Sequence, residues 1–336
     1  MILPAIVALL VAPQVTQVEA VLEHRLGSAS RAPEEAFGVV SDLAADDEGN
    51  VYVLDQRADA VRVFSASGEY LRTIGQRGRG PGQFNRPNHI DVHDGFVTVL
   101  NPGGRTSTFT LAGELVESTA LPMGALSAER LGDVAYAAYV SGGISRDTPT
   151  PTESVIVVGS SSVDTIVTGP SSDLLFRSRT LTSLVRTSLC RLVYFSVGSR
   201  AEIWIASGID GTLTEWRAGR STRVAPEGAA LPDSTRSRLL GTLPSQLDPD
   251  AGDLSVPPTY SSICGLERSE GDAIWVRLNS AEGRERWMAY EPTTLSPTFD
   301  LIAPEGVAVR AFSGTRAYGT WSDAAGVAYV GIFRLE

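Results

Sequence analysis

Lysine is absent from the sequence: all 28 basic residues are arginine. This absence excludes every mechanism that needs a lysine Schiff base or a lysine general base. No Gly-x-Ser-x-Gly run is present either, so the strand-to-helix turn that carries the nucleophile of many serine hydrolases is not predicted. The chemistry that the chain supports must come from other residue types.

Cysteine is scarce, with only Cys190 and Cys264 in 336 residues. Two cysteines do not make a disulfide framework for a chain of this length. They can form one bridge in an oxidising compartment. They can also stay free, because both fall in or near strands that we expect to be buried, where free cysteine is common. The sequence leaves both states open.

Long apolar runs are missing except at the start of the chain. Residues 2–12 are apolar, which is too short a run to span a bilayer. The run is typical of the core of a secretory signal peptide, with Val18-Glu19-Ala20 as a cleavage site, although the usual positive residues before it are missing. We therefore predict an atypical signal peptide over residues 1–20 and export to the periplasm or the cell exterior. An ordinary apolar N-terminal segment is the alternative.

The charge is strongly acidic, with a formal net charge of -11 and a pI near 4.9. Such a surface favours solubility and disfavours nucleic acid and anionic membrane as partners. Hydrophobic residues make up 43% of the chain and charged residues 20%, a composition that can bury a large core. A length of 336 residues ordinarily suggests two domains, but repeat folds can be this long as one unit.

Residues 39–84 carry a complete set of signals for one four-stranded antiparallel sheet. Asp46-Asp47-Glu48-Gly49-Asn50 is a turn sequence, because Gly and Asn adopt positive φ at low cost. The flanking runs are short, rich in β-branched and aromatic residues, and show no helical period. The four predicted strands are Val40–Ala45, Val51–Leu54, Ala60–Phe64 and Tyr70–Ile74.

The rest of the chain repeats this unit. Ile203-Trp204 matches Ile274-Trp275 at an offset of 71 residues, and Trp216 matches Trp287 at the same offset. Because these tryptophans recur in phase with the units, we expect them to pack in the core. Six units follow from the predicted starts of the second strands, near Val51, Val97, Val134, Ile203, Ile274 and Ala317.

The last unit contains only three predicted strands, and the N-terminal strand supplies the fourth. Two segments have the same pattern. Leu26-Gly27 is followed by Ala32-Pro33 and Phe37, just as Ile74-Gly75 is followed by Gly80-Pro81 and Phe84. The N-terminal strand therefore occupies the place of a last strand without a unit of its own. We predict an all-β, six-bladed β-propeller of four-stranded antiparallel blades over residues 21–336, closed by residues 21–26. Insertions are expected at 169–188 and 226–260.

The first unit resembles an NHL repeat, through Asp47–Asp55, Val61–Phe64 and Gly78–Pro87. The match is close in this unit, fair in the second, and rests on spacing elsewhere. The whole chain is similar to the bacterial six-bladed propellers built from such repeats. That resemblance implies the fold strongly and the function weakly, because the family includes lyases, lactonases, recognition modules and exported propellers without a known activity.

The lyases of this family would need a zinc ion held by histidines from several blades, and this chain has only His24, His89 and His93. His24 falls on the outer closing strand and the other two share one inner strand and its turn, so they do not converge, and we assign no metal ligand. Lactonase-type members hold a divalent cation with carboxylates and amides at the channel mouth.

We expect six residues on or near the inner strands to line the channel mouth and bind a ligand: Asp42, Asn88, His89, Asp91, Tyr260 and Arg310. Channel water bound by the same side chains is the alternative. No residue is assigned a catalytic role.

Arg77, Arg79 and Arg86 cluster in the loop after the first unit, but no aromatic residues alternate with them and the net charge opposes nucleic acid. We therefore predict an exported, monomeric binding or interaction module for a protein or small-molecule ligand, without a cofactor or membrane segment. The alternative is a lactonase-like hydrolase or lyase in the channel that uses calcium or another divalent cation.

Overall fold

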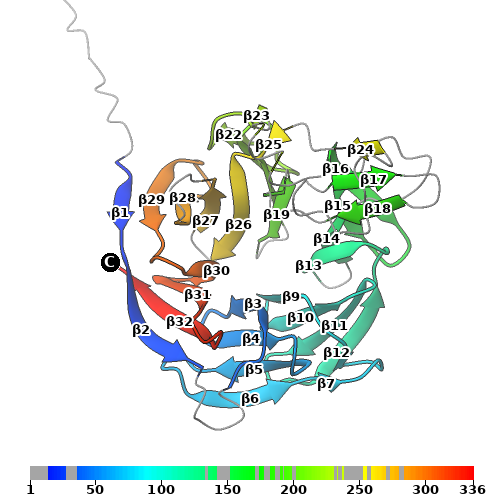
Figure 1. Ribbon diagram of the computed structural model, residues 1–336, viewed down its shortest axis with the longest axis vertical. Coiled ribbons are helices and arrows are strands. Elements are labelled where there is room, and N and C mark those ends of the chain that lie inside the picture. Colours follow the sequence, from blue (N-terminus) through cyan, green and yellow to red (C-terminus); the bar gives the residue numbers. More distant parts are fainter. Residues whose placement is uncertain are drawn as a thin grey trace, which may run out of the picture.

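The computed structural model describes residues 14–27, 36–132, 135–141, 152–170, 174–177, 182–185, 190–191, 193–198, 202–230, 233, 237, 253–255, 259–269, 273–279 and 284–336. Six four-stranded antiparallel blades stand in a ring (Figure 1). The predicted six-bladed propeller is therefore confirmed. Within the described part of the chain, no helix is long and apolar enough to cross a membrane.

Each blade is a meander that runs from an inner to an outer strand. Blade 1 contains β3 (Val40–Ala45), β4 (Val51–Asp55), β5 (Ala60–Phe64) and β6 (Tyr70–Ile74). Blade 2 contains β9 (His89–His93), β10 (Phe96–Asn101), β11 (Arg105–Thr110) and β12 (Leu115–Ala120). Blade 3 contains β13 (Ala125–Leu131), β14 (Ala135–Ser141), β15 (Thr152–Val158) and β16 (Val163–Pro170). A short pair, β7 (Gln76–Arg77) and β8 (Gln83–Phe84), links blades 1 and 2.

Blades 4 to 6 repeat the arrangement. Blade 4 contains β19 (Val193–Val197), β20 (Ile203–Ser207), β21 (Thr212–Glu215) and β22 (Ser221–Arg223). Blade 5 contains β26 (Ile263–Ser269), β27 (Ala273–Leu278), β28 (Arg286–Tyr290) and β29 (Pro297–Ile302). Blade 6 contains β30 (Ala308–Ser313), β31 (Arg316–Ser322), β32 (Ala328–Leu335) and β2 (Ala20–Leu26). Each inner strand contacts the next around the ring, and β30 contacts β3. The inner strands therefore enclose a central channel.

The N-terminal strand β2 closes the ring as predicted. It pairs antiparallel with β32, with Ala20 opposite Leu335 and Leu26 opposite Val330. Glu19 and Glu336 extend the pairing, since the backbone N–H of each donates to the carbonyl oxygen of the other at 3.0 Å. Blade 6 is thus built from both ends of the chain.

A further short strand, β1 (Thr16–Val18), precedes the closing strand β2 in the chain. It pairs in parallel with β29, the outer strand of blade 5, and makes that sheet five-stranded. The Gln17 amide donates a hydrogen bond of 2.6 Å to Asp300. β1 falls within the predicted signal peptide, of which residues 1–13 lie outside the described residues, and the signal peptide remains a prediction.

The core is divided among the seams between neighbouring blades. The described residues form six apolar clusters, and each cluster joins two adjacent blades. Trp204, Trp275 and Trp287 are almost fully buried in these clusters, as the repeat pattern predicts. The expectation is wrong for Trp216, which is 39% exposed. Strand β21 ends at Glu215, so Trp216 lies beyond the sheet.

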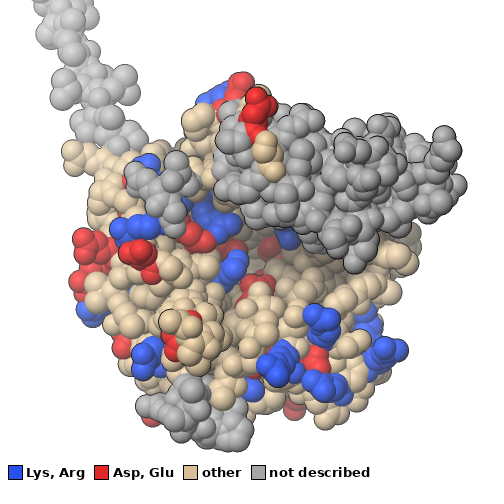
Figure 2. All heavy atoms as spheres, viewed as in Figure 1, with Lys and Arg blue, Asp and Glu red and all other residues tan. Residues whose placement is uncertain are grey.

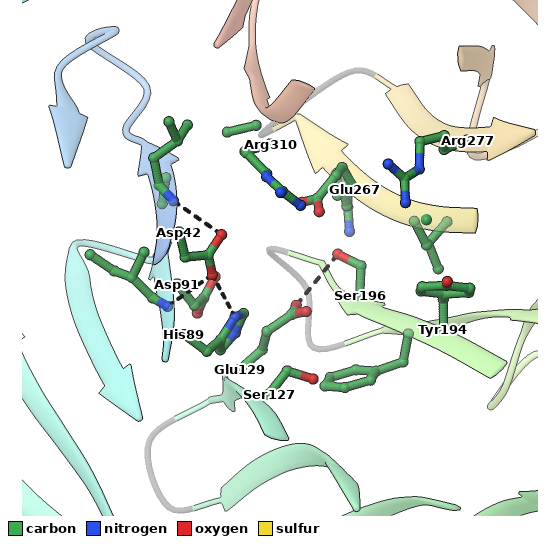
Figure 3. A pocket seen from close by; sticks show the side chains of 18 of the residues that line it. Asp42, His89, Asp91, Ser127, Glu129, Tyr194, Ser196, Glu267, Arg277 and Arg310 are labelled. Atoms are coloured by element: carbon green, nitrogen blue, oxygen red, sulfur yellow. Dashed lines mark hydrogen bonds and ion pairs between the residues drawn. The ribbon is translucent and has the colours of Figure 1, made fainter. Parts of the chain in front are cut away.

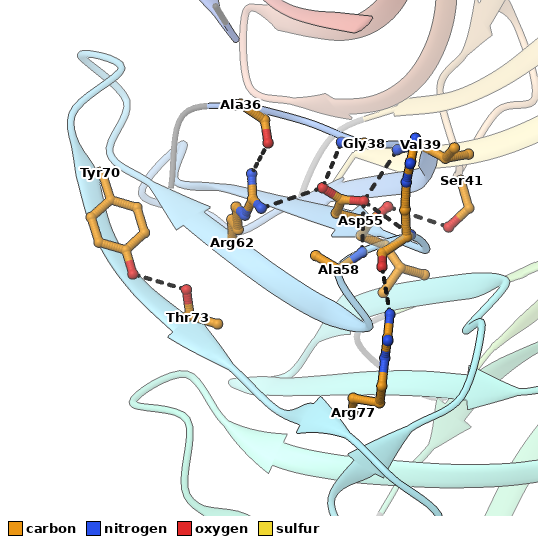
Figure 4. A network of polar contacts seen from close by, with 12 residues as sticks. Ala36, Gly38, Val39, Ser41, Asp55, Ala58, Arg62, Tyr70, Thr73 and Arg77 are labelled. Carbon is orange, nitrogen blue, oxygen red and sulfur yellow. Dashed lines mark hydrogen bonds and ion pairs between the residues drawn. The ribbon is translucent and has the colours of Figure 1, made fainter. Parts of the chain in front are cut away.

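Blade 1 shows how local sequence sets the strands. Gly49 adopts a positive φ of 79°, and its N–H donates to the Asp46 carbonyl at 2.9 Å to close the predicted turn. At the other end of β4, the buried carboxylate of Asp55 accepts backbone N–H bonds from Gly38 and Ala58 at 2.8 and 3.1 Å (Figure 4). One side chain therefore ties the entry loop of the blade to its second turn.

The two predicted insertions meet in space. β17 (Leu174–Arg177) pairs with β18 (Thr182–Val185) within the first insertion, and with β24 (Asp253–Ser255) from the second. A second small pair joins β23 (Ala229–Ala230) to β25 (Thr259–Tyr260). Segments far apart in sequence thus share one three-stranded sheet (Figure 1).

The ring closure can be tested with two leucines of the same strand. Leu26 is 4% exposed and packs at the seam between blades 6 and 1, whereas Leu22 is 47% exposed. We expect Leu26→Ala to lower the free energy of unfolding by about 2–5 kcal/mol, and Leu22→Ala to change it by less than about 0.5 kcal/mol. Urea unfolding followed by tryptophan fluorescence measures both. Equal losses would contradict closure through packing of β2.

Candidate channel site

The central channel holds a cavity of about 450 Å³ lined by residues of all six inner strands. A space-filling view shows the hollow with acidic and arginine side chains in its wall (Figure 2). Each blade contributes at least one polar side chain to this wall. In blade order these include Asp42, Asp91, Glu129, Ser196, Glu267 and Arg310.

β-Bulges interrupt four of the inner strands, and one of them aims Arg310. The pairing register shifts by one residue in the inner strands of blades 1, 3, 5 and 6. In β30, Val309 pairs with Gly319 and Ala311 with Tyr318, which leaves Arg310 as the extra residue. Bulges of this kind redirect a side chain from the regular alternation. Arg310 is exposed and lines the cavity as a result.

Asp42 and His89 form a pair across the seam between blades 1 and 2. Asp42 Oδ2 lies 2.8 Å from His89 Nδ1 and accepts the Ile90 backbone N–H at 3.2 Å (Figure 3). In neutral His89, the Nδ1–H donates to Asp42 and Nε2 is the acceptor. Nε2 is buried and has no hydrogen-bond partner in the described structure.

Glu129 bridges blades 3 and 4. Its Oε2 accepts the Val197 backbone N–H at 2.6 Å and the Ser196 hydroxyl at 3.4 Å. Burial raises the pKa of Glu129 well above its ordinary value, and the charge of Asp91 raises it further, while the bond from Val197 acts in the opposite direction. The carboxyl group therefore has a structural role and also holds its proton more tightly than an exposed glutamate.

Asp91 and Glu267 lie in the same electrostatic environment. Burial raises the pKa of Asp91, and His93 and His89 partly oppose this effect. Burial likewise raises the pKa of Glu267 well above its ordinary value, with a further contribution from Asp42, while Arg310 and Arg277 lower it. Asp91 Oδ2 is buried and accepts no hydrogen bond in the described part of the chain. The channel acids thus influence one another across the cavity.

Most arginines in the cavity wall already have partners. Arg277 is ion-paired with Glu285 and donates to the Cys264 carbonyl at 3.0 Å. Arg268 pairs with Glu202 at 2.7 Å. The guanidinium of Arg191 lies 4.2 Å from the centre of the Tyr139 ring. These contacts hold three of the positive charges against the wall.

The cysteines left open by the sequence form a disulfide, Cys190–Cys264. Cys190 precedes the inner strand of blade 4, and Cys264 lies in the inner strand of blade 5, so the bridge joins two blades at the cavity wall. The described part of the chain contains no free cysteine.

The structure places five of the six predicted site residues at the cavity: Asp42, Asn88, His89, Asp91 and Arg310 all line it. The Asn88 amide donates to the Leu126 carbonyl at 3.3 Å. Tyr260 lies in β25, but its side chain is outside the described residues. Ligand binding by these residues remains a prediction.

Sequence reasoning missed Glu129 and Glu267. A usable signal existed for Glu267: the 71-residue offset between units four and five maps Ser196 onto position 267. Glu129 had no comparable signal, because the third unit carries no tryptophan to fix its register. Among the described residues, no three His, Cys, Asp or Glu side chains are grouped closely enough to hold a metal ion. The predicted cation site therefore gains no ligand set from this part of the chain.

A family model described as a 6-bladed beta-propeller matches residues 34–166, which run from the loop before blade 1 into the last strand of blade 3. This match agrees with the observed architecture. It does not specify NHL repeats, and that finer resemblance remains a prediction. No curated protein matches the chain.

Two crystal structures share the fold. One, from Bacteroides fragilis NCTC 9343, is named "Putative exported protein"; it is 13% identical, with 95% of each chain covered and a TM-score of 0.55. The other is a member of the DUF4221 family from Bacteroides vulgatus ATCC 8482; it is 8% identical, with 96% of this chain and 99% of that chain covered and a TM-score of 0.53. At these identities the likeness concerns the fold alone.

The disulfide should stabilise the seam between blades 4 and 5. Its cysteines are 74 residues apart, and closing a loop of this size in the unfolded chain contributes about 2–4 kcal/mol. We expect the Cys190→Ser/Cys264→Ser double variant to lose this amount in urea unfolding. Thiol titration of the unreduced, denatured wild type should find no free thiol. Two titratable thiols would contradict the bridge.

Glu267 should make stability depend on pH. Because its pKa is raised in the folded state, the folded protein binds the proton more tightly than the unfolded chain does. Its contribution is complete below about pH 4.5 and is lost as the pH rises through the raised pKa. Glu267→Gln should therefore be more stable than wild type at pH 8, with the difference shrinking towards pH 4. Urea unfolding across this range measures it, and the exposed Glu305→Gln is the control. If the difference in stability between Glu267→Gln and wild type did not change with pH, the raised pKa of Glu267 would be rejected as its cause.

Proposed function

We propose that this chain is an exported binding protein whose ligand site is the central channel. The observation that carries the proposal is the convergence of polar side chains from all six inner strands on one cavity of about 450 Å³. That volume lies within the range of small-molecule sites in proteins, about 300–1,000 Å³. The ligand we propose is a small polar molecule, or a side chain presented by a partner protein.

The energetics of the wall support a binding role. Burying acidic groups in a cavity costs free energy, because each loses water without gaining a full set of partners. Asp91, Glu129 and Glu267 all have raised pKa values, and burial is the main cause for each. Titratable groups perturbed in this way gather at functional sites. A wall selected for stability alone would favour apolar or fully paired residues here.

Three observations support export. The disulfide Cys190–Cys264 is typical of proteins in oxidising compartments. The N-terminal sequence is typical of a signal peptide core. A crystal structure with the same fold is named as an exported protein. The acidic net charge of -11 favours small-molecule or protein ligands over nucleic acid. We propose that the protein acts as a monomer.

A thermal-shift screen tests the channel as the binding site. Small polar metabolites are screened against the wild type and against Ser127→Trp, which places a large ring in the cavity from the half-buried Ser127 of β13. We expect at least one compound to raise the melting temperature of the wild type, with a gain near 2.7 kcal/mol at about 100 times its Kd. The same compound should not affect the filled variant.

Arg310→Ala provides the second variant, because Arg310 is exposed to the channel and its truncation leaves the core unchanged. Circular dichroism and unliganded melting temperatures establish that both variants fold. A compound that stabilises wild type and both variants equally would place the site outside the channel. The absence of any stabilising compound would favour a channel that contains only water.

A further inference from the structure

We propose that the channel binds an organic cation with N–H donors, such as an alkyl ammonium or diammonium compound, between Asp91, Glu129 and Glu267. This inference rests on the proposed function, because it names the class of ligand for the same cavity. The three carboxyl groups come from blades 2, 3 and 5, so no single local sequence motif contains them. Their side chains point into the one cavity (Figure 3).

The first argument is the mutual influence of the acids. The charge of Asp91 raises the pKa of both Glu129 and Glu267, and the charge of Glu267 also raises that of Glu129. A nearby like charge disfavours the ionised form of a carboxyl group, and all three of these groups line the same cavity. The other titratable groups that act on them are Asp42, His89, His93, Arg277 and Arg310. A bound cation would satisfy the same carboxylates together.

The second argument is independent of charge. Asp91 Oδ2 is buried and accepts no hydrogen bond among the described residues, and His89 Nε2 is in the same state. His89 Nδ1 already contacts Asp42 at 2.8 Å, so only Nε2 of this ring is left without a contact among the described residues. A buried acceptor without a donor costs about 1–3 kcal/mol. A ligand with N–H donors, such as an ammonium group, would supply the donor that Asp91 Oδ2 lacks among the described residues.

The third argument is the state of the positive groups. Arg268, Arg277 and Arg191 are held by Glu202, by Glu285 and by the Tyr139 ring respectively. Arg310 lowers the pKa of Glu267, which partly offsets the effect of burial on that group. An anionic ligand would thus meet carboxylates on several sides. A cationic ligand would instead displace the protons that the carboxyl groups of Asp91, Glu129 and Glu267 retain.

Isothermal titration calorimetry of the full chain tests the ligand class with 1,4-diaminobutane. Two compounds with the same four-carbon skeleton are the controls, neutral 1,4-butanediol and anionic succinate. We expect saturable binding of the diamine alone. Because binding should displace protons from the carboxyl groups, the measured heat should change between buffers of different ionisation enthalpy.

Matched variants locate the diamine. Asp91→Asn and Glu267→Gln keep side-chain size but remove one charge each, and each should weaken binding by at least about tenfold. Glu305→Gln removes an equal charge from an exposed site outside the channel and should leave the affinity within about twofold. Circular dichroism establishes the fold of each variant.

Three results would overturn the inference: no binding of the diamine, equal binding of butanediol or succinate, or equal weakening by Glu305→Gln. These results are distinct from failure of the proposed function. If the metabolite screen finds another compound whose effect is abolished by Ser127→Trp, the channel remains a binding site and only the cationic class is rejected.

Discussion

The antiparallel pairing of β2 with β32 is the interaction on which the rest of the structure depends. Every blade has two apolar faces, and each face is buried only if a neighbour stands on that side. A closed ring gives each blade two neighbours, and it needs a complete sixth blade. Without β2, Leu26 would be lost from the seam between blades 6 and 1. The closure also fixes the circle of inner strands, and therefore the cavity between them.

The channel acids depend on this frame. Asp42 and Glu129 each accept a backbone N–H from the inner strand of the next blade, so they help to align neighbouring blades and also face the cavity. Asp91 likewise accepts a backbone N–H from Arg130 of the next inner strand, and burial remains the main cause of the raised pKa of both Asp91 and Glu267. A rigid ring can hold such groups close together because many seams stabilise it, whereas a flexible loop would let them separate into solvent. The position of these acidic side chains thus depends on the whole ring.

The sequence predicts the blades and the closure because both have local signals: turn residues such as Gly49, short β-branched runs, and the repeated Gly-Pro loop. It also predicts Asp42, His89, Asp91 and Arg310 on the channel wall, since their strands are recognisable. It does not predict the Asp42–His89 contact or the disulfide, because both depend on the distance between separate blades. Glu129 was missed because the third unit carries no tryptophan to fix its register, whereas Glu267 was missed although the 71-residue offset places it on an inner strand. Trp216 was misplaced because β21 ends one residue before it.

The closing pair also determines how the molecule bears force. Ala20 lies opposite Leu335, so the two chain segments leave the pair at the same end. A pull that separates Glu19 from Glu336 therefore loads the hydrogen bonds between β2 and β32 one after another, as in unzipping, and never all at once, as in shear. The strand pair that completes the ring is held by hydrogen bonds and packing, whereas the seam between blades 4 and 5 is also crossed by the covalent Cys190–Cys264 bond. We therefore expect tension applied at these two segments to open blade 6 first and to leave blades 4 and 5 joined.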